Sequence, residues 1–256
     1  MSNSTPKRFV ILPCAGIGRR MGGDQPKFLM DLGGMTVLGL TLKQLHDCKE
    51  IDQILLVIHP HFMEEFSKRY LFEIPHSKVS YVISGGKERQ DSIWHGLQCL
   101  KGSQGDFQKL NPSKGAKPLI GQDQDLVAVH DAVRPFASSK MFTQIFQKAQ
   151  THGGAIIATP AKDTIKEKTD DLHLRTLNRE KILQAQTPQA FKLGLLIKAY
   201  ENAYEKKLLG TDDASLVEAL GHPIKIVMGN VWNLKITTPE DLIVARALWQ
   251  NKEKKD

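Results

Sequence analysis

The chain of 256 residues contains only three cysteines, Cys14, Cys48 and Cys99, and they lie far apart. Because no Cys-x-x-Cys pair and no histidine-rich ligand spacing occurs, the sequence argues against a structural zinc site. Scattered free thiols are typical of a reducing compartment, so we expect a cytoplasmic protein. The first eight residues also lack the apolar stretch of a secretory signal.

Long hydrophobic runs and aromatic side chains are scarce as well. No apolar stretch is long enough to span a bilayer, so we expect no contact with a membrane. Lysine and arginine outnumber aspartate and glutamate by 35 to 28, which permits anionic partners, including nucleic acid. Aromatic residues make up only 7%, and no array of aromatic and basic side chains for stacking bases is present. The charges are dispersed, so we favour small phosphorylated substrates over nucleic acid.

The two commonest phosphate-binding motifs are absent. No Gly-x-x-x-x-Gly-Lys-Ser/Thr string occurs, and Met21 stands where a dinucleotide fingerprint needs a third small residue. Instead, the apolar run Phe9–Leu12 leads into a loop, residues 13–29, that combines glycines with Arg20 and Lys27. Backbone amides exposed by glycine form, together with fixed cations, a cradle for phosphate groups. The loop therefore suggests a triphosphate site, against the alternative of an ordinary turn with a solvated basic face.

Short apolar runs alternate with longer amphipathic stretches along the whole chain. Nearly continuous apolar runs are typical of strands buried on both faces of a mostly parallel sheet, so we expect a three-layer α/β fold. We assign residues 7–250 to one domain. The expected strands are Phe9–Leu12, Ile54–Ile58, Val79–Ile83, Leu126–His130, Ala155–Thr159 and Ile224–Met228. The expected helices are Val37–Cys48, His61–Tyr70, Gln90–Leu100, Ser139–Thr151, Leu193–Ala203, Asp212–Leu220 and Pro239–Gln250.

Two segments break this rhythm. Residues 102–124 are polar, contain two prolines and show no periodicity, so we interpret them as a surface insertion. Residues 160–190 contain an alternating stretch, two aspartates and a second extended stretch, which indicates a hairpin arm projecting from the sheet. An exposed arm needs a partner to cover it, and a second subunit is the usual one.

Ligands of open α/β sheets bind beyond the carboxyl ends of the strands, so polar residues there are the first site candidates. Gly85 and Gly86 follow one expected strand, and they allow close approach of a flat ligand with Ser92 nearby; a plain glycine turn is an equal alternative. Asp131 follows another strand and has the chemistry to hold Mg²⁺ or sugar hydroxyls, while Arg134 has the chemistry to clamp a phosphate. An Asp–Arg ion pair closing the turn is the alternative there.

Further motifs complete a pattern that resembles one family. From about residue 9 to 249 they resemble, in order, those of 2-C-methyl-D-erythritol 4-phosphate cytidylyltransferases. The motifs are Ala15-Gly-x-Gly-x-Arg-Met21, Pro26-Lys27, Gly85-Gly-x-x-Arg89-x-x-Ser92, His130-Asp-Ala-x-Arg-Pro135, Thr187-Pro-Gln189, Thr211-Asp212 and Asn233-x-Lys235-x-Thr237-x-Pro-Glu-Asp241. Departures include Phe28 after the lysine, Lys87 after the double glycine and Trp232 before the asparagine, where the family often has glutamine and acids.

The resemblance implies a Rossmann-like nucleotidyltransferase fold and a homodimer with shared active sites. It implies CTP and a polyol phosphate as substrates, Mg²⁺ as cofactor with Asp131 as its protein ligand, and a role in non-mevalonate isoprenoid synthesis. The implied catalytic residues are Arg20, Lys27 and Lys235. The implied nucleotide-binding residues are Pro13, Cys14, Ala15, Gly16, Gly18, Arg20, Lys27, Gly85, Gly86 and Ser92. The implied acceptor-binding residues are Asp131, Arg134, Thr187, Thr211, Lys235 and, from the partner subunit, Arg179.

The sequence leaves two other functions open. A ribitol-5-phosphate or similar polyol phosphate cytidylyltransferase shares most of these motifs. A basic protein that binds nucleic acid on this fold without catalysis is supported by the formal net charge of +7 and by the insertion.

Overall fold

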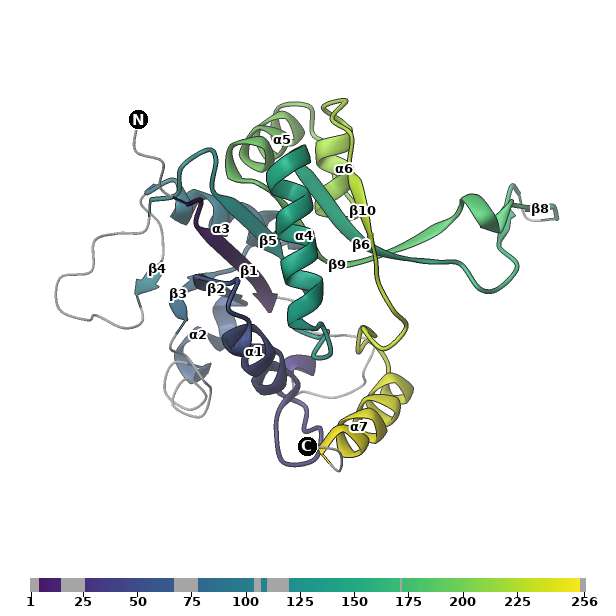
Figure 1. The fold of residues 1–256 in the computed structure, drawn as a ribbon, viewed down its shortest axis with the longest axis horizontal. Helices are drawn as coiled ribbons and strands as arrows, with labels where there is room; N and C mark the ends of the chain where they lie inside the picture. Colours follow the sequence, from purple (N-terminus) through teal and green to yellow (C-terminus); the bar gives the residue numbers. More distant parts are fainter. Residues whose placement is uncertain are drawn as a thin grey trace.

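An eight-stranded sheet forms the centre of the computed structural model, which describes residues 5–14, 26–66, 78–103, 107–109, 120–170 and 172–253 (Figure 1). The strand order is β10-β6-β9-β5-β1-β2-β3-β4. These strands are β1 (Arg8–Cys14), β2 (Gln53–Ile58), β3 (Val79–Ser84), β4 (Phe107–Lys109), β5 (Leu126–Val129), β6 (Gly154–Pro160), β9 (Leu183–Lys192) and β10 (Lys225–Met228). The helices are α1 (Val37–Asp47), α2 (Met63–Glu65), α3 (Arg89–Leu100), α4 (Ser139–His152), α5 (Leu193–Glu205), α6 (Asp213–Glu218) and α7 (Pro239–Glu253).

Most strand pairs are parallel, as predicted. Strand β1 pairs in parallel with β2 and β5, β2 with β3, and β6 with β10. Strand β9 is antiparallel to both β5 and β6, and β4 is antiparallel to β3. The parallel strands β1, β2 and β5 therefore present their carboxyl ends at one edge of the sheet, where a ligand site is expected.

Helices cover both faces of the sheet, because successive side chains of a strand point to opposite sides. Along β1, Val10 and Leu12 belong to the core beneath α1 and α4, whereas Phe9 and Ile11 belong to the core beneath α3 and α5. All four side chains are fully buried. This arrangement confirms the three-layer α/β fold. A third, smaller cluster packs α7 against the segment that leads into α1, through Trp249 and Ala245.

A thin arm projects from the sheet in Figure 1 and carries the hairpin β7 (Lys166–Lys168) and β8 (Leu174–Thr176). The projecting arm was predicted, but its far boundary differs. Residues 183–190, which the sequence placed in the arm, lie in β9: Leu183–Gln186 pair with the end of β6, and Gln189 and Ala190 lie between β5 and β6. The expected helix 61–70 is short within the described residues: a 3-10 turn, Pro60–Phe62, followed by α2. Part of the 102–124 insertion, β4, pairs with the edge of β3.

Candidate functional site

A buried carboxylate with three cations around it lies beyond the carboxyl end of β5. Asp131 Oδ2 is 2.9 Å from Lys235 Nζ and 3.3 Å from Arg134 Nε. Its other oxygen, Oδ1, is 3.9 Å from Arg89 Nε. Burial alone would raise the pKa of Asp131, but Lys235, Arg89 and Arg134 outweigh that effect and lower the pKa to about 2. Asp131 is therefore ionised at neutral pH and holds the three cations together.

The backbone at Asp131 is fixed by two buried neighbours. The Asp131 N–H donates to Thr187 Oγ1 over 2.9 Å, and the Thr187 hydroxyl lies 3.1 Å from His130 Nδ1. His130 Nε2 lies 3.2 Å from the Arg134 carbonyl oxygen. Burial lowers the pKa of His130 to about 4, so the ring is neutral at pH 7. A neutral ring satisfies every contact when Nε2–H donates to the carbonyl and Nδ1 accepts the Thr187 hydroxyl.

Thr187 was predicted to contact the acceptor. In this structure its hydroxyl supports the Asp131 backbone, and the residue is buried.

The segment that carries Lys235 is anchored by Asn233, which is fully buried. Asn233 Nδ2 donates to the Thr187 carbonyl oxygen over 2.9 Å and to Gln186 Oε1 over 3.0 Å. The Asn233 carbonyl in turn accepts Arg134 Nη1 over 2.7 Å. These bonds join a residue from each of three distant chain segments, and they bring Lys235 to Asp131 as predicted. Asn233 itself was part of the family motif but was not predicted as a site residue.

Lys27 links the nucleotide loop to this same segment. Its Nζ donates to the Thr237 carbonyl oxygen over 2.7 Å. Thr237 is held in turn by Asp241 at the start of α7, whose Oδ2 accepts the Thr237 N–H and hydroxyl over 2.8 Å each. Lys27 therefore contacts a residue that lies two positions after Lys235 in the sequence, and its role in holding the triphosphate stays a prediction.

The nucleotide-binding residues predicted at positions 13–20 include two that the structure describes, Pro13 and Cys14. Pro13 and Cys14 end β1, and burial raises the pKa of the Cys14 thiol well above its usual value, so this cysteine is not a nucleophile. Ala15, Gly16, Gly18 and Arg20 lie outside the described residues.

The Gly85–Ser92 turn is tightly formed after β3. Ser92 Oγ accepts the Gly86 N–H over 3.1 Å and lies 3.1 Å from the Glu88 carbonyl oxygen, to which it donates. A Cβ added to Gly86 would lie 2.3 Å from Asp91 Cβ, so only glycine fits there. The Gly85 N–H donates to the Ile58 carbonyl oxygen over 2.7 Å. The Ser92 hydroxyl thus shapes the turn, and the N–H groups of Gly85 and Gly86 are both engaged.

Arg89 and Asp213 are site residues that the sequence reasoning missed. Arg89 Nη2 donates to Asp213 Oδ2 over 2.7 Å, and Asp213 is fully buried. Burial lowers the pKa of Arg89, but Asp213 and Asp131 outweigh it, so the net pKa is raised and the side chain is charged. The spacing Gly-Gly-x-x-Arg was visible in the sequence, yet nothing local predicts a partner 124 residues away.

The two other acceptor-binding predictions, Arg179 and Thr211, are not among the residues that form ion pairs with Asp131 within the described residues. Arg179 begins a 3-10 turn, Arg179–Lys181, between β8 and β9, and its Nη1 donates to the Lys162 carbonyl oxygen over 2.9 Å. Thr211 is exposed and directly precedes Asp212, whose Oδ1 accepts the Ser215 N–H and caps α6. The structure therefore brings together Asp131, Arg134, Thr187 and Lys235, and leaves Arg179 on the arm.

The described residues include no group of three acidic, histidine or cysteine side chains that would hold a metal ion. Asp131 offers one ionised carboxylate, with Lys235 and Arg134 at one oxygen. Mg²⁺ that is bound mainly through phosphate oxygens and water needs only one or two carboxylates. The donor set therefore fits a magnesium ion held mostly by a nucleotide, with Asp131 as its protein ligand.

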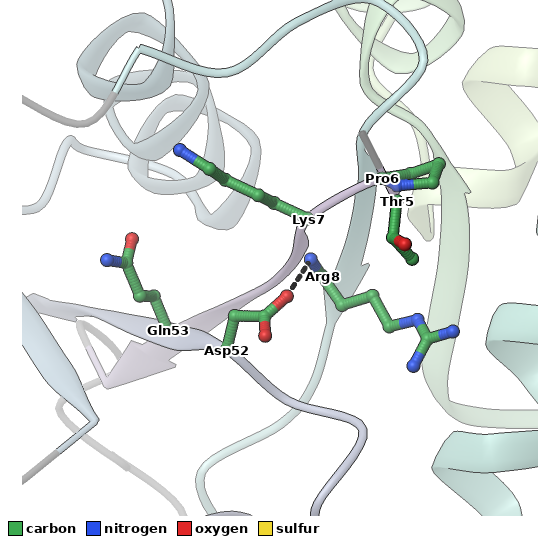
Figure 2. Close-up of a pocket in the computed structure, with 6 residues that line it drawn as sticks. All are labelled: Thr5, Pro6, Lys7, Arg8, Asp52 and Gln53. Atoms are coloured by element: carbon green, nitrogen blue, oxygen red, sulfur yellow. Dashed lines mark hydrogen bonds between the residues drawn. The ribbon is translucent and has the colours of Figure 1, made fainter. Parts of the chain in front are cut away.

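A hollow of about 300 Å³ lies elsewhere, at the amino ends of β1 and β2. Figure 2 shows its lining, where the Arg8 N–H donates to Asp52 Oδ2 over 2.7 Å. Because β1, β2 and β5 are parallel, this hollow is at the opposite edge of the sheet from Asp131. It is not part of the candidate site.

Throughout the described ranges, no helix combines the length and apolar character needed to cross a bilayer.

Comparison with known proteins gives a consistent result. The sequence model described as IspD, 2-C-methyl-D-erythritol 4-phosphate cytidylyltransferase, matches residues 9–124 and 108–251 in two overlapping segments. A protein of that name from Syntrophus aciditrophicus is 40% identical over 97% of this chain and 98% of its own length. One from Geobacter metallireducens is 38% identical over 95% and 98%.

Solved structures agree. The crystal structure of 4-diphosphocytidyl-2C-methyl-D-erythritol synthase from Anaerococcus prevotii is 33% identical, with a TM-score of 0.76 and 96% of each chain covered. The Francisella tularensis 2-C-methyl-D-erythritol 4-phosphate cytidylyltransferase is 31% identical, with a TM-score of 0.73 over 95% of this chain and 99% of that one. The chain belongs to the 2-C-methyl-D-erythritol 4-phosphate cytidylyltransferase family.

Proposed function

We propose that this protein transfers CMP from CTP to 2-C-methyl-D-erythritol 4-phosphate. The products are 4-diphosphocytidyl-2-C-methyl-D-erythritol and pyrophosphate, and the reaction belongs to isoprenoid biosynthesis. Family membership supports the reaction. The single structural observation that carries it is the cluster at Asp131, where Arg89, Arg134 and Lys235 converge on one edge of the sheet. A site of this kind suits two anionic substrates that must be brought together.

The chemistry needs alignment and charge neutralisation more than a base. An oxygen of the acceptor phosphate attacks the α-phosphorus of CTP, and the bond from that phosphorus to the bridging oxygen breaks as pyrophosphate leaves with its electron pair. A phosphate dianion is already a nucleophile, so no proton has to be removed. The state of His130 is consistent with a reaction that needs no base, because both ring nitrogens are engaged and the ring is buried and neutral.

The proposed roles combine the sequence motifs with the contacts of the described residues, and the role of Arg20 rests on its motif alone. Arg20 and Lys27 hold the triphosphate, and the Gly85–Gly86 turn reads cytosine with Ser92 shaping it. Asp131 accepts an acceptor hydroxyl, and Arg134 and Lys235 face the charge that develops at the reacting phosphates. Mg²⁺, when bound, would neutralise triphosphate charge, with Asp131 as its protein ligand.

A homodimer completes the proposal. The arm presents Leu172 and Leu174 with 89% and 66% of their surface exposed, so apolar area there has no cover within this chain. Arg179 at the base of the hairpin would then enter the partner's site together with Thr211 of that site. We also assign the protein to the cytoplasm, on the free state of its three buried thiols.

Pyrophosphate release tests the function. The purified protein with Mg²⁺ is given CTP, UTP, ATP or GTP together with 2-C-methyl-D-erythritol 4-phosphate or ribitol 5-phosphate. We expect turnover with CTP and methylerythritol phosphate, and the diphosphocytidyl product by mass spectrometry. A site that hydrogen-bonds an amino group rejects the keto analogue strongly, so UTP should be poor. Equal turnover with UTP, or a preference for ribitol 5-phosphate, would overturn the assignment.

A further inference from the structure

A chain of buried polar groups runs from the candidate acceptor site into the core. Arg89 lies between two carboxylates, with Nη2 2.7 Å from Asp213 Oδ2 and Nε 3.9 Å from Asp131 Oδ1. The second oxygen of Asp213 accepts the Tyr200 hydroxyl over 2.6 Å. Asp213 and Tyr200 are both fully buried, so neither touches a substrate. The proposed chemistry gives them no task.

Their burial needs an explanation, because an ionised carboxylate in the core is costly unless it is paired and hydrogen-bonded. Asp213 meets that condition with one donor at each oxygen. Burial raises the pKa of Tyr200 well above its usual value, which keeps the phenol protonated as a donor. Tyr200 therefore fixes the Asp213 carboxylate, and Asp213 fixes the Arg89 guanidinium.

The position of Arg89 determines whether one oxygen of Asp131 stays available to a ligand, because the two oxygens have different partners. Lys235 and Arg134 both approach Oδ2. Among the described residues, the ion pair at Oδ1 is the one with Arg89 Nε, which at 3.9 Å is beyond hydrogen-bond length, so Oδ1 keeps lone pairs for an acceptor hydroxyl. A guanidinium released from Asp213 would close on Oδ1 and take that place.

We propose that Tyr200 and Asp213 are positioning residues that hold Arg89 off Asp131 Oδ1, and thereby set the affinity of the site for the hydroxyls of its polyol phosphate. This rests on the proposed function. It predicts that the effect falls on the acceptor, because the contacts run from Tyr200 through Asp213 and Arg89 to Asp131 Oδ1, where the acceptor hydroxyl would bind.

Tyr204 supplies a matched control. It lies one helical turn further along α5, contacts the same Trp94 ring, and donates its hydroxyl to Asp91 Oδ1 on α3 over 2.8 Å. Tyr204→Phe therefore also removes a phenol–carboxylate hydrogen bond made by α5, but one that joins α5 to α3, whereas the Tyr200 bond joins α5 to α6. Asp91 has no contact with Asp131 among the described residues.

The experiment compares the KM for each substrate, kcat and the melting temperature in the parent, Tyr200→Phe, Tyr204→Phe and Asp213→Asn. We expect Tyr200→Phe to raise the acceptor KM about three- to tenfold, the loss typical of one hydrogen bond, with the KM for CTP within about twofold. Asp213→Asn, which keeps the shape and removes the charge, should raise the acceptor KM at least as far. Tyr204→Phe should lower the melting temperature without changing the acceptor KM.

If Tyr200 had a purely structural role, Tyr200→Phe and Tyr204→Phe would both lower the melting temperature, and the acceptor KM would be the same in the two variants. An acceptor KM unchanged in both Tyr200→Phe and Asp213→Asn would overturn the inference. If Tyr200→Phe does not fold, the result for the isosteric Asp213→Asn decides. A parent protein that is inactive with CTP and methylerythritol phosphate would reject the proposed function, whereas an active parent with unresponsive variants would reject this inference alone.

Discussion

Acidification should destabilise this protein through His130, beginning at a higher pH than that at which its carboxylates titrate. The ring is fully enclosed, and its two nitrogens are engaged with the Thr187 hydroxyl and the Arg134 carbonyl. Burial lowers its pKa from 6.5 to about 4, the charge of Asp131 raises the pKa by a smaller amount, and the charge of Arg134 lowers it further. If Nδ1 were protonated, the Thr187 hydroxyl would have to accept its proton as well as the Asp131 N–H, which it already accepts.

The sign follows from the direction of the shift. The folded pKa lies below the unfolded one, so the unfolded chain binds the proton first as the pH falls. The contribution is present in full above pH 6.5 and is lost progressively between pH 6.5 and about 4. A difference of this size corresponds to about 3 kcal/mol of unfolding free energy, from about 1.4 kcal/mol per pKa unit. That is a large part of the stability of an ordinary domain.

Urea unfolding at several pH values between 7.5 and 4.5 measures this loss. His130→Gln keeps one donor and one acceptor but cannot be charged, so its stability should fall much less over this range. The exposed His173, on the arm, provides the control, and His173→Gln should follow the parent. Subtracting the unfolding free energy of His130→Gln from that of the parent at each pH cancels the carboxylate titration that the two proteins share. If that difference stays constant from pH 6.5 to 4.5, His130 is not the neutral, buried group described above.

Three further predictions address the site. Lys27→Ala should lower kcat about 10²- to 10³-fold with an unchanged melting temperature, by analogy with other preorganised donors, and near-normal turnover would remove Lys27 from the mechanism. Asp131→Asn should abolish most turnover and cost about 2 kcal/mol at pH 7, a loss that disappears in urea melts below pH 2, where the parent carboxyl is also neutral. Mixing inactive Arg179→Ala and Lys27→Ala proteins should restore turnover, because about half the dimers after random exchange hold one intact site. Exchange shown by mass without regained turnover would contradict a shared site.

The sheet and its helices were predictable because their signal is local. Strands β1, β2 and β3 are continuous apolar runs, and they occur within a residue or two of the predicted ranges. The start of α7 was equally clear, since Thr238 and Pro239 precede two acids, and Asp241 does accept the backbone N–H of Thr238. Burial on both faces of the sheet leaves little freedom in such segments.

Strand β9 shows why the rest was less accessible. Its first half, from Leu183, is exposed and pairs with the end of β6, while its second half lies between β5 and β6. The buried half contains Thr187 and Gln189, whose polar side chains break the apolar pattern. Thr187 is there to support Asp131, and Gln189 donates to Asp212 over 2.7 Å. The polar residues that contact the site therefore interrupt the apolar pattern by which the strand would have been predicted.

The charges of the site show the same limit. Read along the sequence, Arg89, Asp131 and Asp213 are ordinary charged residues of turns and helix starts, and most such side chains are solvated. Only the fold places them in one chain of contacts. Arg89 and Asp213 are 124 residues apart in the sequence, so no pattern of spacing could have predicted their pairing.

That pairing also explains why a carboxylate stands at the centre of a site for anions. Arg89, Arg134 and Lys235 would repel one another if they converged with no negative charge between them. Asp131 and Asp213 hold them in place, and the three cations still outnumber the two acids. The repulsion among the three cations is therefore already overcome in the folded protein, before any substrate binds. Incoming phosphates meet cations that are already oriented, which is the condition under which such groups stabilise a transition state most strongly.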